Sequence, residues 1–204
     1  MRQLAAIFIF SLMLAGILYA EDAENVFKNV TVGFEVTKPE SWHFLTVDQD
    51  LENIKNMKLG DDEFHKLMIK YATAPLVIMT KYPEPYGDLN PSFKANIKPY
   101  GDLKGKDPKE VLTLLTNQIR NVFKDYVVVQ PPSDAEVAGI KSGYMRVNYS
   151  LQAKDGTAFP ITFEFWIVPR GDYFFMIGGG TRQDEKTGSR TEISEIIKTI
   201  KIKK

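Results

Sequence analysis

Apolar residues are most concentrated at the start of the chain. A single positive charge at Arg2 precedes an apolar run from Leu4 to Ala20, and the acidic residues Glu21 and Asp22 follow it. This order of charge, apolar run and polar boundary is typical of a secretory signal peptide. We therefore predict that residues 1–20 form a signal peptide cleaved after Ala20. The alternative is an uncleaved membrane anchor, for which the run has the minimum length.

After a polar leader at 21–29, alternation of apolar and polar residues predicts strands, and apolar spacings of three and four predict helices. The expected strands lie at 30–36, 67–72, 76–82, 93–98, 127–129, 144–151, 161–167 and 173–177. The expected helices lie at about 48–58, from 107 onward, and at 191–200. Most connections between strands are short, so the sequence predicts an α+β fold in one domain, 30–204, with a largely antiparallel sheet.

The clearest helix signal begins at Asp107. Asp107 suits the N-cap, Pro108 suits the first helical position, and Glu110 has the spacing of a capping box. Apolar residues then recur on one face, with Leu115 at its centre. By contrast, Pro131 is expected to end the short strand that precedes it.

Several segments together resemble the PsbP/Mog-like superfamily, as in an exported bacterial PsbP-like (DcrB-like) protein. The segments are Gly33–Val36 with Pro39-x-x-Trp42, Pro75–Tyr82, Asn90-Pro91-Ser92 and Val137–Tyr144. The resemblance implies an α/β/α sandwich around an antiparallel sheet, in a superfamily whose members are mostly non-catalytic. None of its motifs is a catalytic signature, so the resemblance assigns no functional residue here.

Composition excludes several classes of protein. The chain has 26 basic and 26 acidic residues and no cysteine. The absence of cysteine excludes a disulfide framework, a thiolate metal site and a cysteine nucleophile. Because its formal net charge is zero, the protein lacks the strong positive electrostatic field of a nucleic-acid-binding protein. We therefore expect no nucleic-acid partner.

Two segments offer candidate chemistry, and for both the structural interpretation is favoured. Asp61, Asp62, Glu63 and His65 are the densest set of hard-metal ligands, but an exposed charged turn explains them better. The Gly178–Gly180 run differs from a phosphate-binding loop because acidic residues precede Lys186. A close backbone approach is the better explanation of these glycines. We therefore expect no metal and no cofactor.

A five-residue repeat is the most unusual local feature. The sequence Pro-Tyr-Gly-Asp-Leu occurs at 85–89 and again at 99–103, on either side of the predicted strand 93–98. Such residues are ordinary turn formers, but exposed tyrosines can also contact a partner. If the protein has a binding surface, we expect Tyr86, Asp88, Tyr100 and Asp102 to form it, at opposite ends of one strand.

These observations predict a non-enzymatic, exported binding or assembly module of the bacterial cell envelope, periplasmic or secreted. Its partner would be another envelope protein, and its membrane contact would be limited to an uncleaved N-terminal segment. One alternative is a hydrolase with two carboxylates, recognisable by a cleft and a raised pKa. Another is a small-molecule carrier with an enclosed cavity lined by Tyr149, Phe163 and Phe165.

Overall fold

The computed structural model describes residues 25–70, 72–120, 123, 125–184 and 189–203. The predicted signal peptide lies outside them. The described helices are α1 (Val47–Asn56), α2 (Asp62–Lys70), α3 (Pro108–Ile119), α4 (Arg190–Thr199) and the 3-10 helix η1 (Gly101–Leu103). The strands are β1 (Val26–Asn29), β2 (Phe34–Thr37), β3 (His43–Phe44), β4 (Val77–Thr80), β5 (Ser92–Pro99), β6 (Val127–Val137), β7 (Ile140–Gln152), β8 (Ala158–Arg170), β9 (Tyr173–Arg182) and β10 (Lys201–Ile202).

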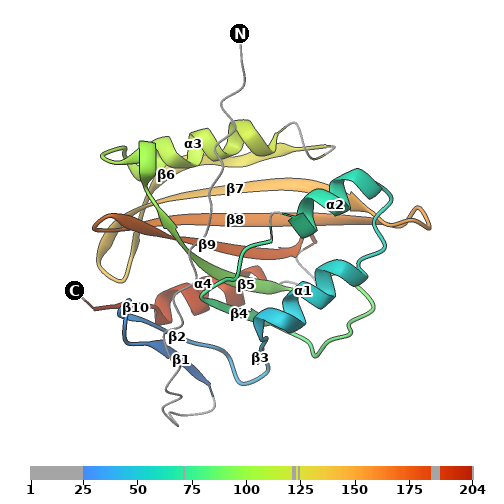
Figure 1. Ribbon diagram of the computed structural model, residues 1–204, viewed down its shortest axis with the longest axis horizontal. Helices are drawn as coiled ribbons and strands as arrows, with labels where there is room; N and C mark the ends of the chain where they lie inside the picture. The colour runs from blue at the N-terminus through green and yellow to red at the C-terminus, as the bar shows by residue number, and fades with distance from the viewer. Residues whose placement is uncertain (1–24, 71, 121–122, 124, 185–188, 204) are drawn as a thin grey trace.

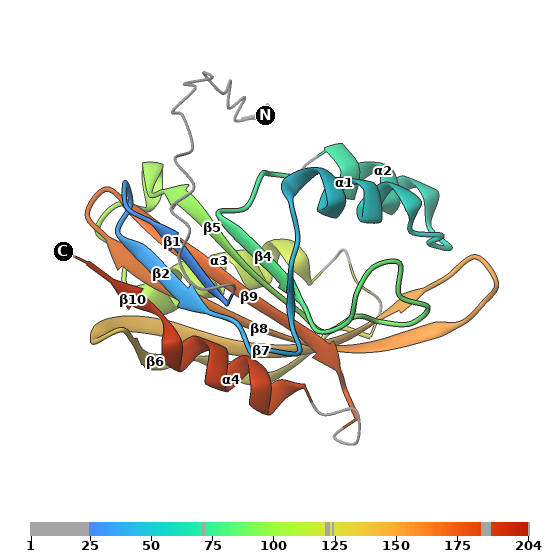
Figure 2. The same cartoon turned by 90° about the horizontal axis from the view of Figure 1, so that it is seen from below.

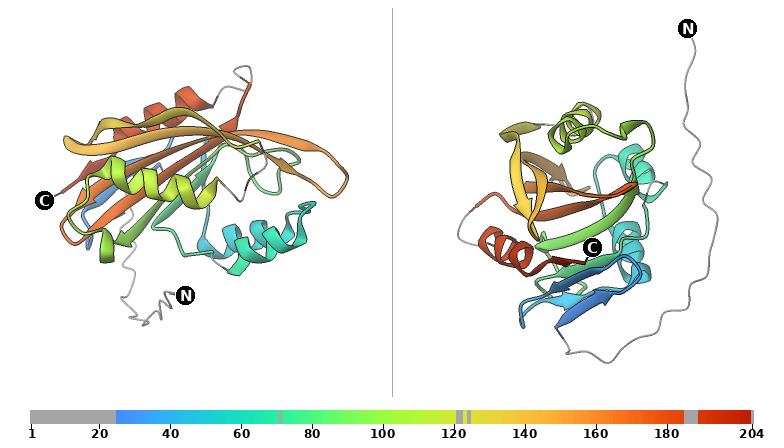
Figure 3. Two further views of the ribbon diagram at one scale, coloured as in Figure 1. Left: turned by 90° about the horizontal axis from the view of Figure 1, so that it is seen from above. Right: turned by 90° about the vertical axis from the view of Figure 1, so that its left-hand side faces the viewer.

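The strands form two sheets, and the paired strands in both are antiparallel (Figure 1). The larger sheet has the order β3-β4-β5-β9-β8-β7-β6, and the smaller has the order β1-β2-β10. Helix α3 covers one face of the larger sheet and α4 covers the other (Figures 2 and 3). The predicted α+β sandwich is therefore confirmed.

Two apolar clusters hold these layers together, one on each face of the larger sheet. On the α4 face, Trp42, Phe93 and Phe175 are fully buried and pack with Ile193 of α4. On the α3 face, Leu112 packs with buried side chains of β7 and β8. Burying such side chains is the main favourable contribution to the stability of the fold.

The segment 67–72, predicted as a strand, belongs largely to helix α2. Asp61 explains the difference, because its Oδ1 accepts a hydrogen bond from the backbone N–H of Phe64 at 2.9 Å. This contact satisfies a donor in the first turn of the helix. An apolar run of six residues fits a buried helix as well as a strand, and the acidic start decides between them.

The predicted strand 30–36 is also wrong in its first half, because a tight turn separates β1 from β2. Gly33 has φ +68°, a conformation that residues with a side chain rarely adopt. The carboxamide oxygen of Asn29 accepts a hydrogen bond from the Val32 N–H at 3.2 Å, which closes the turn. Phe34 and Val36 are nevertheless buried, as their alternation predicts.

Strand β6 continues past Pro131, where the sequence predicted its end. β6 pairs only with β7 in the described sheet, and its register shifts between Val128 and Gln130 and between Gln130 and Ser133. An edge strand with such irregularities tolerates proline, because the missing N–H faces no neighbouring strand.

Helix α3 begins as predicted, with Asp107 accepting a hydrogen bond from the backbone N–H of Lys109 at 2.9 Å. Glu110, expected to complete a capping box, lies instead 3.7 Å from the Lys106 ammonium. Leu112 is fully buried, whereas Leu115, the predicted centre of the face, is half-buried. The helix therefore packs most closely through Val111 and Leu112, and Leu115 lies at the edge of the buried face.

Candidate functional site

The two copies of the repeated pentapeptide have different environments. Strand β5 lies between them, so Tyr86 and Tyr100 lie beyond opposite ends of one strand, as predicted. Tyr86 is 39% exposed, whereas Tyr100 is 8% exposed and its ring lies 5.0 Å from that of Phe174. The expectation that both tyrosines are exposed is therefore wrong for Tyr100. Asp102, in η1, is exposed.

The loop that carries Tyr86 is fixed by hydrogen bonds between its own residues. Asn90 accepts from the Tyr82 N–H at 3.1 Å and donates to the Tyr82 carbonyl at 2.8 Å. It also donates to the Glu84 carboxylate, which accepts from the Tyr86 N–H at 2.9 Å. The ring of Tyr86 stacks on that of Tyr82, with their centroids 4.5 Å apart. These contacts hold Tyr86 in one position at the surface.

Asp88 connects the same loop to strand β9 through an ion pair with Arg182. Arg182 is 24% exposed and Asp88 is 42% exposed, so the pair lies at the surface. The two residues are 94 positions apart in sequence, and nothing in the amino-acid pattern predicts that they meet. Arg182 was therefore not predicted at this surface, and neither were Tyr82 and Asn90.

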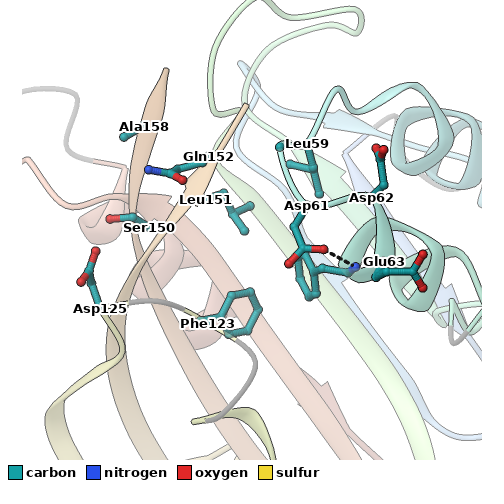
Figure 4. Close-up of a pocket in the computed structure, with 12 residues that line it drawn as sticks. Leu59, Asp61, Asp62, Glu63, Phe123, Asp125, Ser150, Leu151, Gln152 and Ala158 are labelled. Atoms are coloured by element: carbon teal, nitrogen blue, oxygen red, sulfur yellow. Dashed lines mark hydrogen bonds between the residues drawn. The ribbon is translucent and has the colours of Figure 1, made fainter. Parts of the chain in front are cut away.

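A pocket of about 470 Å³ opens at the same end of the larger sheet, between α2 and the β7–β8 hairpin (Figure 4). We call this the hairpin end; Figure 1 shows it, with the β4–β5 loop, on the right. Leu59, Leu151 and Phe123 supply apolar surface to the pocket. The Phe123 ring stacks on the Tyr149 ring, with their centroids 4.1 Å apart. Tyr149 itself does not line the pocket. Tyr149, Phe163 and Phe165, whose enclosed cavity would favour the small-molecule carrier, are not among the residues that line this pocket.

The acidic residues of the pocket do not converge on one point. Figure 4 shows Asp125 and Glu63 on opposite sides of it, with Asp61 between them bonded to the backbone of α2. Asp62 pairs with Lys154 at 2.8 Å, and the pKa of its carboxyl is lowered, mainly by that contact. Within the described residues, no three carboxylate or histidine side chains form a group that could hold a metal ion.

His65, the remaining member of the predicted acidic set, has a structural role. Its Nε2 lies 2.6 Å from the backbone carbonyl oxygen of Ile54, so this nitrogen carries the hydrogen and donates to α1. The contact joins α2 to α1. His43, the other histidine, is exposed on β3, beside the buried Trp42.

Glu164 is a buried carboxyl in a different part of the protein. Burial raises the pKa of Glu164, and the opposing effects of a hydrogen bond from Tyr144 and of the charges of Arg190 and Arg146 are smaller. Glu164 lies on the α4 face of the sheet and does not line the pocket. A carboxyl with a raised pKa therefore exists, but outside the cleft that a hydrolase would use.

Comparison with known proteins identifies the fold. No family model and no curated protein matches the sequence. Among solved structures, the chain is similar to LpqN, involved in cell envelope biogenesis of Mycobacterium tuberculosis, with 15% identity and a TM-score of 0.51 over 84% of this chain and 83% of LpqN. It is also similar to the Ran-binding protein Mog1p of Saccharomyces cerevisiae, with 8% identity and a TM-score of 0.51 over 87% of this chain and 94% of Mog1p.

A third similar structure is cyanobacterial PsbP (CyanoP) from Synechocystis sp. PCC 6803. The identity is 10% and the TM-score is 0.50, over 92% of this chain and 98% of CyanoP. The chain has the PsbP/Mog-like fold. At these identities a shared fold does not imply shared site residues.

Among its described residues, the chain has no helix that is long and apolar enough to cross a membrane. At the hairpin end, the described residues include the exposed loop with the stacked rings of Tyr82 and Tyr86, and an open pocket lined by both polar and apolar side chains. Their side chains bond to one another and to the backbone. Such a surface can contact a binding partner.

Proposed function

We propose that the protein is a non-catalytic, exported binding or assembly module of the bacterial cell envelope. The apolar segment at residues 1–20 has the pattern of an export signal. The similar protein LpqN is involved in cell envelope biogenesis, and the similar protein Mog1p is a Ran-binding protein. These likenesses support a binding role, and the contact surface follows from the geometry of this chain.

The observation that carries the proposal is the fixed exposure of Tyr86. Binding normally costs side-chain and loop entropy, and a loop that is already ordered loses less of it. Tyrosine offers a large contact area with few rotatable bonds, and it is enriched among the residues that dominate interface energies. We assign the partner contact to Tyr86 and Asp88. Tyr100 is buried, and Asp102 lies at the other end of β5, so neither belongs to this surface.

The partner is another envelope protein, because the β4–β5 loop and the pocket lie at the same end of the larger sheet. A protein can contact both features at once. The ion pair between Asp88 and Arg182 lies beside Tyr86, so a partner that contacts the Tyr86 ring would also meet polar groups at the edge of the interface.

Photo-crosslinking tests this function. p-Benzoyl-phenylalanine is placed at position 86 and, as a control, at position 113, which is exposed on α3 far from the loop. In envelope preparations of the source organism, we expect a discrete protein adduct at position 86 and none at position 113. Asp88→Asn should reduce the adduct by about threefold to tenfold. Equal adducts at both positions, or none at 86, would contradict the proposal.

The pocket supports one second candidate, a small-molecule carrier. Its volume of about 470 Å³ lies within the usual range for ligand pockets, and it combines apolar side chains with a few polar ones. Native mass spectrometry of the protein purified from its own envelope would show a bound mass that is lost in Phe123→Ala. An unliganded mass in both proteins would exclude this candidate.

A further inference from the structure

We propose that a basic pocket at the opposite end of the fold binds a phosphate group. The pocket has a volume of about 320 Å³ and is formed by the β1–β2 turn, the end of β8 and the residue after β10. Its polar lining comes from Lys28, Asn29, Thr31, Glu35, Arg170 and Lys203. In Figure 2 these elements lie together beside the C-terminus, away from the β7–β8 hairpin.

The topology brings these residues together from three distant parts of the sequence. Strand β2 lies between β1 and β10, so Lys28 and Lys201 are both cross-strand partners of Glu35. The Lys203 N–H donates to the Gly33 carbonyl at 2.8 Å, and a guanidinium N–H of Arg170 donates to the Lys203 carbonyl. The pocket is therefore held by backbone contacts.

Arg170 and Lys203 place two positive charges at the pocket. Among the described residues one carboxylate, Glu35, also lines it, and its Oε1 accepts a hydrogen bond from Lys201 of β10 at 2.6 Å. The hydrogen bond to Lys201 and the charges of Lys28 and Lys203 lower the pKa of Glu35 and keep it ionised. Asp172, two residues after Arg170 in the sequence, pairs with Lys104 at 2.8 Å. A bound anion would interact favourably with the charges of Arg170 and Lys203.

Arg170 and Lys203 form no ion pair with any carboxylate in the described part of the chain. Arg170 uses one N–H on the Lys203 carbonyl, and its buried Nε has no hydrogen-bond acceptor among the residues that the structure describes. Arginine has five N–H donors in a fork that matches the oxygens of phosphate. The Asn29 oxygen is occupied by the Val32 N–H, which leaves its NH₂ group to donate. These donors supply both charge and direction for an anion.

A phosphate here has two sources, a free phosphate or the headgroup of an anionic lipid. The β1–β2 turn places Val30 next to the pocket, and this side chain is 81% exposed. An exposed apolar side chain among cations is the chemistry of a membrane surface contact. The lipid source rests on the proposed envelope location, whereas the phosphate chemistry does not.

Two binding assays on the full chain test the proposal and distinguish the sources. The first assay measures how much protein floats with vesicles of phosphatidylglycerol and phosphatidylcholine, compared with vesicles of phosphatidylcholine alone. Insertion of residues 1–20 would contribute equally to both kinds of vesicle, so the difference between them reports binding to the anionic lipid. The other measures the thermal midpoint in inorganic phosphate against sodium chloride of equal ionic strength. The test variant is Arg170→Gln with Lys203→Gln. The control is Lys66→Gln with Lys154→Gln, which removes the same charge from exposed lysines at the hairpin end.

For a lipid source, we expect the phosphatidylglycerol-dependent binding to fall about tenfold or more in the test variant and to change less than twofold in the control. For a free-phosphate source, we expect a saturable rise in midpoint that the test variant loses. Equal losses in test and control variants, or no binding in either assay, would overturn the proposal. If the double variant does not fold, the single variant Lys203→Gln repeats the test, because Lys203 is exposed and its replacement should leave the fold intact. Crosslinking at position 86 is independent of these results.

Discussion

The hydroxyl of Tyr144 on β7 donates a hydrogen bond to the carboxylate of Glu164 on β8. Glu164 is 6% exposed, and the Nε of Arg190, at the start of α4, lies 3.7 Å from the same carboxylate. The contact joins two central strands to the helix that covers them. Because burial outweighs these favourable contacts, the pKa of Glu164 is raised.

The raised pKa predicts how stability depends on pH. Between the ordinary glutamate value of about 4.3 and the raised value, the folded state holds a proton that the unfolded state has released. The contribution of Glu164 to the free energy of unfolding therefore falls as pH rises through this window, by at most about 1.4 kcal/mol per pH unit. Glu164→Gln should remove this decline. Urea unfolding at several pH values measures it, and a difference between the two proteins that is constant with pH would contradict the assignment.

The two tyrosines of the repeat should respond oppositely to truncation. Tyr100→Ala should lower the free energy of unfolding by about 3 kcal/mol, because its buried ring packs on Phe174. Tyr86→Ala should change it by less than about 1 kcal/mol, because the ring is exposed and loses one stacking contact with Tyr82. Chemical denaturation of both variants gives the comparison. Similar losses at the two positions would show that the environments do not differ.

Gly179 should not tolerate a side chain. A Cβ at this position would lie 2.6 Å from the Cγ2 of Ile193 on α4. Gly179→Ala should therefore destabilise the fold by about 1–3 kcal/mol, because α4 would have to move away from the sheet. Gly87→Ala is the matched control, since nothing lies within 4 Å of its added Cβ. Thermal unfolding should separate the two, and equal midpoints would refute the close packing of α4.

Helix α3 offers a test within one element. Leu112→Ala should cost about 2–5 kcal/mol, because the side chain is fully buried between α3 and the sheet. Leu114→Ala should cost less than about 0.5 kcal/mol, because Leu114 is 39% exposed. Equilibrium unfolding in guanidinium measures both, and a small effect at Leu112 would mean that α3 does not pack as described.

The sequence by itself determined the elements whose signals are local. The Asp107-Pro108 start of α3 depends on groups within a few residues, and the alternation at 144–151 and 161–167 depends on neighbours along one strand. Short connections between such strands also predicted the antiparallel sheet. These features follow from the backbone geometry of single elements, so no distant contact was needed to predict them.

The tertiary structure decided what depends on distant neighbours. Identical pentapeptides place one tyrosine at the surface and one in the core, because only the second lies against Phe174. Asp88 meets Arg182, and Arg170 meets Lys203, only after the strands between them have paired. Burial and ion pairing are properties of the packed chain. The pentapeptide pattern therefore could not show which tyrosine is exposed, whereas the fold leaves Tyr86 at the surface and buries Tyr100.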